Sequence, residues 1–530
     1  MPTRRTLAGL LVGAGLLTAA ACGGSSSSGS SAATSPGGGG ASSGKATKDV
    51  QLAYNADMQV PDPDIFYEIE GNSLVTSVYE GLVRYKPNSK EIEPALAESY
   101  TVSPDGLTYT FKLRPNVKFH DGTTLDSSAM KTAFERRTNV NSAPAYMLAD
   151  VAGYETPDPQ TFVVKLNKPV SAFLDYMAAP YGPKAVSQKV LTEQAGNDFA
   201  QSYLKEHDGG TGPFTITEFN VGNQYKVSKF NDYWGPKPDA TSITYNILPD
   251  ISTQRLKFEN GELSMIIHGL TASDIKSLES SGSYQVQRFP AVFKSWVMIN
   301  PNKAPFDDQS LRQAVAKAID REQIVKEVYG DDASVSTQIY PAGELPPDKA
   351  LDVKKDTSAL QSQASKISGT LDIGYSSDDP RNQRVAELLQ TQLQALGVQA
   401  TTRGIPIAQV FDLPKNKDQA PQILVSTVNP DAVHPDTWAR IFMSTDGALN
   451  WLQCSVPEAD KLLDQGLNTT DQQVVTDSYS KAGDKFVESG CFASIADVKE
   501  VIVAQQGYSG WTHQQPTLFT VRFGDLKVGS

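Results

Sequence analysis

The chain has 530 residues, 39% of them hydrophobic, and a formal net charge of −13 at pH 7. This length exceeds that of one usual hydrophobic core, so we expect two or more domains. The acidity argues against a nucleic acid or an anionic lipid surface as a binding partner.

The N-terminal stretch resembles a bacterial export signal with a lipid attachment site. Residues 3–5, Thr-Arg-Arg, form a short basic head, and an uncharged apolar run follows from Leu7 to Ala21. The run is shorter than the roughly 20 residues that a membrane-spanning helix needs. Three alanines then precede Cys22, which resembles a lipobox, and we predict a signal peptide at 1–21 and a lipid on Cys22. The alternative is a secreted protein with an unmodified cysteine, and both Sec and twin-arginine export stay open.

Residues 22–45 predict a flexible tether. They are rich in glycine and serine and have too few apolar side chains to fold. Such a coil has an end-to-end distance of roughly 25 Å. We therefore expect the remaining residues to lie close to the outer face of the cytoplasmic membrane, in the cell envelope. No other segment is apolar enough to span a membrane.

The folded part begins near residue 46 and mixes strand and helix patterns. The turn 103–106 precedes an alternating stretch, Tyr109–Leu113, that predicts a strand, and Ser127–Glu135 predicts a helix. Between Asp308 and Tyr329 the apolar residues recur on one face of an amphipathic helix.

A later segment predicts a βαβ unit. Thr370–Tyr375 has a strand pattern, Asn382–Leu396 a helix pattern that ends at Gly397, and Val398–Thr402 a second strand pattern. Such a unit favours a parallel sheet covered by helices. The sequence thus predicts the α/β fold class.

Two further cysteines, Cys454 and Cys491, predict a disulfide, because a remaining pair in an exported protein is most simply joined. A metal site is disfavoured, since no histidine or third cysteine lies at ligand spacing nearby. We expect neither a metal nor a cofactor.

No catalytic motif is apparent. The five histidines form no metal-spaced pair, and the chain has neither a nucleophile elbow nor a phosphate-binding loop. The segment 120–122 contains a His-Asp pair that could belong to a catalytic dyad, but a turn before the predicted helix at Ser127 explains it better. We therefore expect the protein not to be an enzyme.

Four stretches in order resemble the family-5 extracellular solute-binding proteins of ABC importers. They are 96–125, LAESYTVSPDGLTYTFKLRPNVKFHDGTTL; 210–214 followed by 231–235; 261–262 after a predicted helix at 252–260; and 299–308 followed by 311–321. Each stretch also has a structural explanation, such as Asp308 capping the helix after it. They indicate the fold more than the ligand.

The resemblance implies a two-lobed periplasmic-binding-protein-like fold of type II, cluster C, with a hinge between the lobes and an inserted domain. Lobe I would combine 46–83, 208–292 and 506–530. The inserted domain would be 84–207, and lobe II would be 293–505. The implied protein is a monomer that closes on a small solute and delivers it to membrane permease subunits.

The resemblance also implies a ligand site. In the family's peptide receptors an aspartate in the loop that corresponds to residues 428–436 binds the α-ammonium of the ligand, and here that position is Asp431. The alternative is that Asp431 is a surface carboxylate that caps the helix beginning near Asp436. A buried carboxylate needs a cation, which a peptide amine would provide. The other candidate ligand-binding residues are Val428, Asn429 and His434 in the same loop, Tyr67, Glu68 and Ile69 in the facing loop, and, with looser alignment, His268 and Trp296.

Departures from the family pattern bear on the ligand. Dipeptide receptors have an arginine for the ligand carboxylate near the end of the strand 371–375, whereas this chain continues with Asp378 and Asp379. We therefore expect an oligopeptide rather than a dipeptide. Nickel and haem are disfavoured because histidines are few. A lipid-anchored envelope enzyme or adhesin on the same fold is the rival hypothesis.

Overall fold

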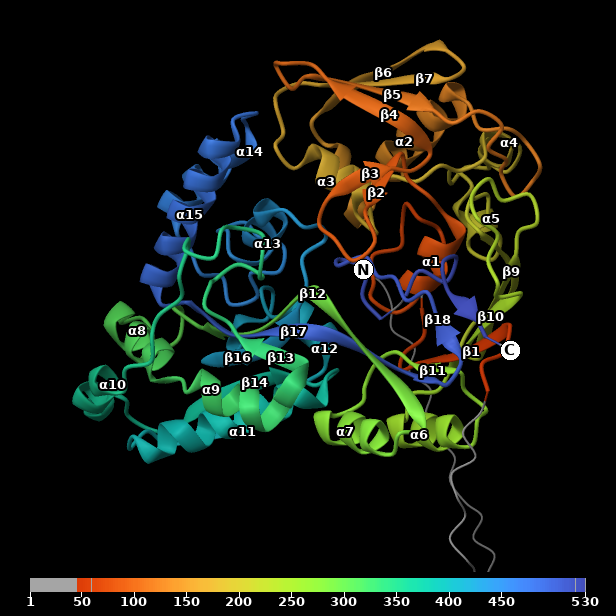
Figure 1. Cartoon of the computed structure of the whole chain (residues 1–530). Coiled ribbons are helices and arrows are strands. Elements are labelled where there is room, and N and C mark those ends of the chain that lie inside the picture. Colours follow the sequence, from red (N-terminus) through yellow and green to blue (C-terminus); the bar gives the residue numbers. More distant parts are fainter. Residues whose placement is uncertain (1–44, 59, 520, 530) are drawn as a thin grey trace, which may run out of the picture. The chain divides into compact units, whose positions relative to one another are not determined.

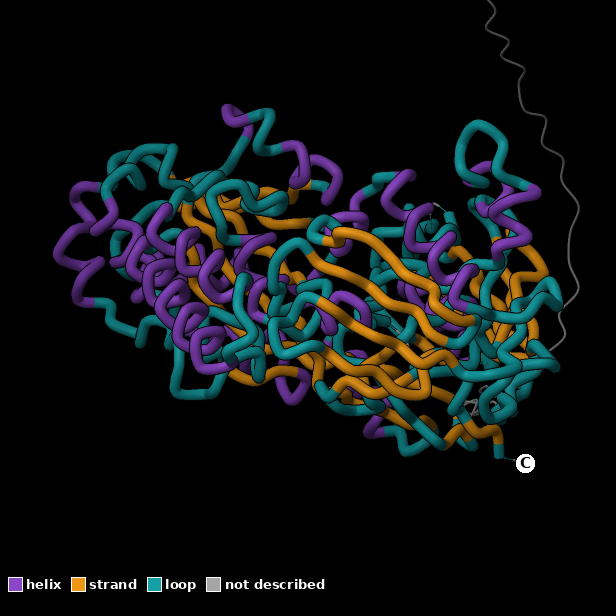
Figure 2. The backbone as a smooth tube through the Cα atoms, turned by 90° about the horizontal axis from the view of Figure 1, so that it is seen from above, coloured by secondary structure: helices purple, strands orange, loops and turns teal. Residues whose placement is uncertain are grey.

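A computed structural model describes residues 45–58, 60–519 and 521–529 of the chain. The predicted signal peptide, Cys22 and the predicted linker up to residue 44 lie outside these residues. The described residues form helices and strands side by side (Figures 1 and 2), so the predicted α/β class is confirmed. No described helix is long and apolar enough to cross a membrane.

The longest strands form a mixed sheet with the order β11-β17-β12-β16-β14-β15, and β13 pairs beside β17. The strands β12 and β17 run antiparallel along most of their length, and β14 is parallel to β15 and β16. The bounds are β11 (Met265–Ile266), β12 (Tyr284–Ile299), β13 (Ala333–Val335), β14 (Leu371–Ser376), β15 (Ala400–Ile405), β16 (Ile423–Val428) and β17 (Phe492–Gln505).

This sheet separates two hydrophobic cores because successive side chains of a strand point to opposite faces. Phe293 and Val297 of β12 pack into one core, whereas Trp296 and Met298 of the same strand pack into the other. Helices α8 (Gln309–Ala318) and α11 (Pro380–Ala395) contribute to the first core. Helices α13 (Pro435–Phe442), α14 (Pro457–Leu467) and α15 (Gln472–Ser489) contribute to the second. A strand buried on both faces is typical of a sheet covered by two helix layers.

The predicted βαβ unit is confirmed as β14, α11 and β15. Helix α11 spans Pro380–Ala395, with Asp379 as its N-cap, and Gly397 has a φ of 85° just beyond its end. Only glycine adopts this backbone conformation without strain. The parallel pairing of Leu371 with Ala400 sets the register of the two strands.

The single helix predicted between Asp308 and Tyr329 is wrong. Helix α8 ends at Ala318, and the next residue is extended, with a ψ of 122°. Asp320 then caps a new short helix by accepting a hydrogen bond from the backbone of Gln323. The apolar periodicity continues across the break because both pieces pack on the same core. The predicted cap of α8 by Asp308 is confirmed.

Two four-stranded sheets and two strand pairs complete the β structure (Figure 1). One sheet, in the order β1-β10-β9-β8, contains β1 (Asp49–Tyr54), β8 (Phe214–Asn220), β9 (Gln224–Lys229) and β10 (Ser242–Ile247). The other is antiparallel, in the order β4-β5-β7-β6, and contains β4 (Ala97–Val102), β5 (Thr108–Leu113), β6 (Val151–Asp158) and β7 (Thr161–Leu166). The pairs are β2 (Val83–Tyr85) with β3 (Ile92–Pro94), and β18 (Tyr508–Ser509) with β19 (Lys527–Val528).

The helices lie between and over these sheets (Figure 1). The helices before the mixed sheet are α1 (Asn72–Val78), α2 (Ser127–Val140), α3 (Phe173–Ala178), α4 (Gln188–Glu193), α5 (Gln201–Leu204), α6 (Ile251–Glu259) and α7 (Ala272–Ser280). The later ones are α8 (Gln309–Ala318), α9 (Arg321–Ile324), α10 (Ser358–Gln363), α11, α12 (Ile407–Asp412), α13 (Pro435–Phe442), α14 (Pro457–Leu467) and α15 (Gln472–Ser489).

The predicted disulfide between Cys454 and Cys491 is present, with an S–S distance of 2.03 Å. It joins the segment before α14 to the start of β17, and both cysteines are buried in the core with Trp296.

Replacing Cys454 and Cys491 together with alanine is expected to lower the free energy of unfolding. The bridge closes a loop with a sequence separation of 37, which corresponds to about 4 kcal/mol of chain entropy in the unfolded state. Urea denaturation of the oxidised protein, the reduced protein and the variant measures the effect. The reduced protein should match the variant, and equal stability of all three would contradict the expectation.

Candidate functional site

Asp431 lies in the loop between β16 and α13 and is enclosed by two tyrosines from distant parts of the chain. Its side chain accepts hydrogen bonds from Tyr67 Oη at 2.6 Å and from Tyr146 Oη at 2.6 Å, both at Oδ2. Only 6% of the residue is exposed. Tyr67 belongs to predicted lobe I, Tyr146 to the predicted insert, and Asp431 to predicted lobe II. The contacts therefore join all three predicted domains at one carboxylate.

This carboxylate has no cationic partner among the described residues. Burial raises the pKa of Asp431 to about 6, and the hydrogen bonds from Tyr146 and Tyr67 lower it part of the way back. At pH 7 the group is mainly ionised, although its charge is shielded only by two hydroxyl dipoles. A buried anion of this kind is stabilised when a cation is brought to it.

Further tyrosines surround the same place. Tyr181 Oη donates to the carbonyl oxygen of Glu68 at 2.7 Å, and its ring packs edge-on against Tyr67 with centroids 5.0 Å apart. The rings of Tyr146 and Tyr176 are also edge-on, at 5.7 Å. Tyrosine combines a large apolar face with one hydrogen-bonding atom, which suits a site that holds both apolar and polar parts of a ligand.

A tyrosine hydroxyl also fixes the backbone of the Asp431 loop. Tyr85 Oη accepts a hydrogen bond from the backbone N–H of Val433 at 2.9 Å and donates to Asp175 at 2.8 Å. Burial raises the pKa of Asp175 to about 7. The insert thus holds the loop by its backbone as well as by the Asp431 side chain.

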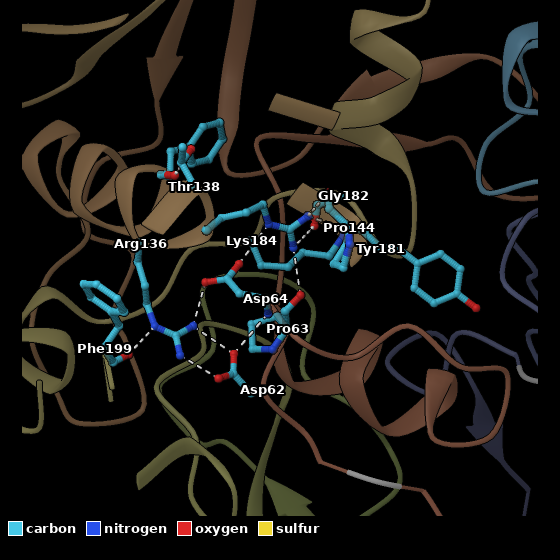
Figure 3. Close-up of polar contacts among 12 residues, drawn as sticks. Asp62, Pro63, Asp64, Arg136, Thr138, Pro144, Tyr181, Gly182, Lys184 and Phe199 are labelled. Carbon is cyan, nitrogen blue, oxygen red and sulfur yellow. Dashed lines mark hydrogen bonds and ion pairs between the residues drawn. The ribbon is translucent and has the colours of Figure 1, made fainter. Parts of the chain in front are cut away.

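A buried ion-pair network anchors the insert beside this site, as Figure 3 shows. Arg136 contacts Asp62 at 2.5 Å and Asp64 at 2.6 Å, and Arg137 contacts Asp64 at 2.8 Å. Arg137 also donates to the carbonyl oxygen of Tyr181 at 2.6 Å. The two arginines lie on α2 of the insert, and the two aspartates precede the Tyr67 loop of lobe I. The network therefore fixes the position of Tyr67 relative to Tyr181.

The structure gives His434 a different role from ligand contact. It is the N-cap of α13, and its Nδ1 accepts a hydrogen bond from the backbone of Asp436 at 3.2 Å. Burial lowers the pKa of His434 to about 4, so the ring is neutral at pH 7. The alternative role for Asp431, a surface carboxylate capping α13, is wrong, because His434 is the cap and Asp431 is buried.

The structure does not bring Trp296 to the Asp431 cluster. Its indole is fully buried and packs against Trp438, Phe442 and Phe492. The alternation along β12 turns Trp296 into the second core, so no atom of the side chain is exposed to a ligand in this conformation. In this conformation Trp296 is a core residue, and its assignment to a ligand pocket stays a prediction.

The other predicted loop residues lie near Asp431 without a demonstrated ligand role. Val428 ends β16 and packs partly on the second core, and Asn429 Nδ2 donates to the carbonyl oxygen of Pro430 at 3.1 Å. Ile69 packs partly against the first core of lobe II. The side chain of Glu68 is half-buried.

His268 belongs to a separate small cluster. Its ring stacks on Phe519 with centroids 3.7 Å apart and lies 4.0 Å from a carboxylate oxygen of Glu70. Burial lowers the pKa of His268 to about 4. A cavity of about 40 Å³ is lined by His268, Phe519 and Arg381 together with other residues.

Arg381 is a residue that the sequence interpretation missed. It lies two positions after Asp379, the second of the two aspartates at the strand end. Its Nε and Nη2 contact the carboxylate of Asp379 at 2.9 and 2.6 Å. The guanidinium also lies over the rings of Phe293 and Tyr329. The strand end therefore carries an arginine as well as acids, but Asp379 already neutralises it.

No described group of three or more His, Cys, Asp or Glu side chains could hold a metal ion.

The chain is similar in sequence to known solute-binding proteins. The sequence profile of the bacterial extracellular solute-binding proteins, family 5 Middle, matches residues 91–450. The probable D,D-dipeptide-binding periplasmic protein DdpA of Escherichia coli K12 is 27% identical over 440 residues, which are 81% of this chain and 84% of DdpA. The glutathione-binding protein GsiB of Shigella dysenteriae is 26% identical over 503 residues, which are 91% and 95% of the two chains.

A solved structure has the same fold. The periplasmic binding protein DppA of Helicobacter pylori, in complex with the peptide STSA, superimposes with a TM-score of 0.77 at 22% identity and covers 91% of this chain and 98% of its own.

Proposed function

Because the chain belongs to the bacterial extracellular solute-binding proteins of family 5, we propose that it captures peptides outside the cell and delivers them to the permease of an ABC importer. The predicted two-lobed fold class is confirmed by the solved relative. Members of this family bind solutes for transport and are not enzymes. The domain boundaries stay a prediction, as does the monomeric state.

The observation that carries the proposal is the buried carboxylate of Asp431, which tyrosines from two other segments enclose. The α-ammonium of a peptide would supply the missing cation and displace no existing ion pair. Main-chain groups of the ligand can bind main-chain groups of the loops, while the tyrosine rings contact its apolar parts. The ligands in the relatives' names support a peptide as the class.

We further propose that peptides longer than two residues are preferred. Arg381 is the cation that could hold a ligand carboxylate near the strand end, but two of its nitrogens already contact Asp379. Burial also raises the pKa of Asp378, which indicates that this place disfavours further negative charge. A longer peptide can keep its C-terminal carboxylate away from these acids.

Peptide affinity is expected to fall as the pH falls below 6. Binding of the ammonium needs the ionised form of Asp431, whose pKa is about 6 in the free protein. The complex therefore holds fewer protons than the free receptor, and affinity at pH 5 should be about tenfold weaker than at pH 7. Calorimetry at pH 5, 6 and 7 measures this. A constant affinity, or one that rises toward pH 5, would contradict the assignment, and Asp431→Asn should remove the dependence.

The predicted tether and Cys22 support the proposal that a lipid holds the receptor beside its permease. Cys22→Ser is expected to release the protein from the membrane fraction into the medium or periplasm, which immunoblotting of cell fractions detects. Retention of the variant in the membrane fraction would show that another element anchors the chain.

Native mass spectrometry of the protein purified from its own envelope tests the proposed function. A bound mass that dissociates on heating and fragments as a peptide supports it. A co-purified metal complex or sugar, with no peptide bound from a defined peptide mixture, would overturn it.

A further inference from the structure

A second cavity lies outside the Asp431 cluster. It has a volume of about 550 Å³ and is lined by residues of α1, the β2–β3 pair, the segments 178–184 and 233–236, and the C-terminal segment 514–525. Neither Asp431, Tyr67 nor Tyr146 lines it. The volume lies within the range of sites that hold metabolite-sized ligands.

The cavity is basic although the chain is acidic. Its lining includes five lysines and arginines but three acids, whereas the chain as a whole carries a net charge of −13. One acid, Glu80, is already satisfied, because it accepts hydrogen bonds from Trp234, Tyr233 and Thr211 at 2.8 to 3.0 Å. The local excess of positive charge is therefore a property of this cavity.

Three arginines in the lining form their hydrogen bonds or shortest ion-pair contacts through Nε, and the guanidinium of Arg114 also lies over the ring of Trp234 at 4.9 Å from its centroid. Arg84 Nε contacts Glu93 at 2.8 Å, and Arg522 Nε lies 3.3 Å from Asp525. Arg114 Nε donates to the carbonyl oxygen of Ala95 at 2.6 Å. In the described part of the chain, the terminal nitrogens of these three guanidinium groups donate no hydrogen bond. Terminal guanidinium nitrogens bind carboxylate and phosphate oxygens in pairs.

Two further features indicate a ligand. Burial lowers the pKa of Arg522, and the positive charge of Arg84 lowers it further, so the two guanidinium groups repel each other. An anion between them would relieve this repulsion. The hydroxyl of Thr517, a residue that is only 3% exposed and lines the cavity, has no hydrogen-bond partner within the described residues. The oxygen of an anion in the cavity would accept a hydrogen bond from this hydroxyl.

We propose that this cavity is a second ligand site, which binds a small organic anion carrying two or more carboxylate or phosphate groups. Arg84, Arg522 and Arg114 bind the oxyanion groups through their terminal nitrogens, and Thr517 donates one hydrogen bond. The site is independent of the peptide site, since it shares none of the residues that enclose Asp431.

The test measures binding of citrate, succinate and inorganic phosphate to the folded chain by calorimetry and by the shift in melting temperature. Lysine, which has one carboxylate, and glucose, which has none, are the negative controls. At least one organic dianion or trianion should bind with a dissociation constant below about 1 mM. Its binding should also change the tryptophan fluorescence of the protein, and this change should be absent in Trp234→Phe. Failure of every anion to bind at about 10 mM would overturn the proposal.

Variants locate the binding. Arg84→Gln with Arg522→Gln should weaken anion binding at least tenfold, while peptide binding stays unchanged. Arg403→Gln is the matched control, because this arginine is exposed and pairs with Asp372 at 3.0 Å outside the cavity. Thr517→Val keeps all three arginines and should weaken binding severalfold, which gives a second readout if the double variant folds poorly. Unchanged anion affinity in the folded arginine variant or in Thr517→Val would contradict the site.

Discussion

Replacing Asp431 with asparagine is expected to weaken the binding of free-amine peptides by at least about 100-fold. Asparagine keeps the size of the side chain and an oxygen that can accept from Tyr67 and Tyr146, but it removes the charge. Loss of one partner from a buried charge pair costs 2–5 kcal/mol of binding free energy, and 100-fold corresponds to about 2.7 kcal/mol. Calorimetry with a peptide that binds the unmodified protein measures the effect.

The same substitution should stabilise the protein without ligand. The pKa of Asp431 rises from 3.8 to about 6 on folding, so the stability from its protonated form is present below pH 4 and is lost as the pH rises through 6. Asparagine stays neutral, and at pH 8 we expect the free energy of unfolding to be about 3 kcal/mol higher than in the unmodified protein. Near pH 3.5 the difference should vanish.

The matched control for Asp431 is Asp412→Asn. Asp412 is an exposed aspartate in the same predicted lobe and contacts Lys415 at 3.3 Å. This variant should change neither peptide affinity nor the pH dependence of stability. Weaker binding in both variants would indicate a general electrostatic effect and not a site at Asp431.

Replacing Arg137 with methionine is expected to lower the free energy of unfolding by 3–5 kcal/mol. Arg137 has no exposed surface and contacts the carboxylate of Asp64 and the carbonyl oxygens of Tyr181 and Pro63. Removing it leaves these acceptors buried with fewer donors, and breaking a buried ion pair typically costs this much. Urea denaturation followed by circular dichroism measures the change.

Arg384→Met is the control for the Arg137 network. Arg384 is exposed on α11 and forms ion pairs with Glu387 at 3.4 Å and Glu327 at 3.5 Å, and exposed pairs contribute less than about 1 kcal/mol. The Arg137 variant should also bind peptides more weakly, because Tyr181 and Tyr67 lose their fixed spacing. A destabilisation equal to that of the control would contradict the anchoring role.

Local patterns in the sequence predicted the parts of the fold that local physics decides. The βαβ unit is marked by apolar strands, an amphipathic helix and Gly397, whose positive φ ends that helix. The helix between Asp308 and Tyr329 was predicted as continuous because both pieces face one core. The break occurs at Asp320, which caps the second helix. In the sequence, a capping residue inside an apolar repeat cannot be distinguished from any other polar residue on the solvent-facing side of a helix.

The site was predictable only in part. Asp431 could be named from the resemblance, but its partners come from residues 364 and 285 positions away. The resemblance also indicated Tyr67 in the facing loop, but nothing in the sequence separates Tyr146 from the other tyrosines among the 20 of the chain. The face of the sheet on which Trp296 lies could not be predicted, because the two faces of a buried strand cannot be told apart when both are apolar. Arg381 could have been found by continuing past the two aspartates to the first turn of α11.

The most direct test compares a pool of short peptides before and after N-terminal acetylation. Acetylation removes the positive charge of the α-amine and leaves the sequences unchanged. The immobilised protein should retain members of the free-amine pool, identified by mass spectrometry after elution, and should lose nearly all of them when the pool is acetylated. Equal retention of both pools would contradict the claim that the carboxylate of Asp431 holds the terminal ammonium of the ligand.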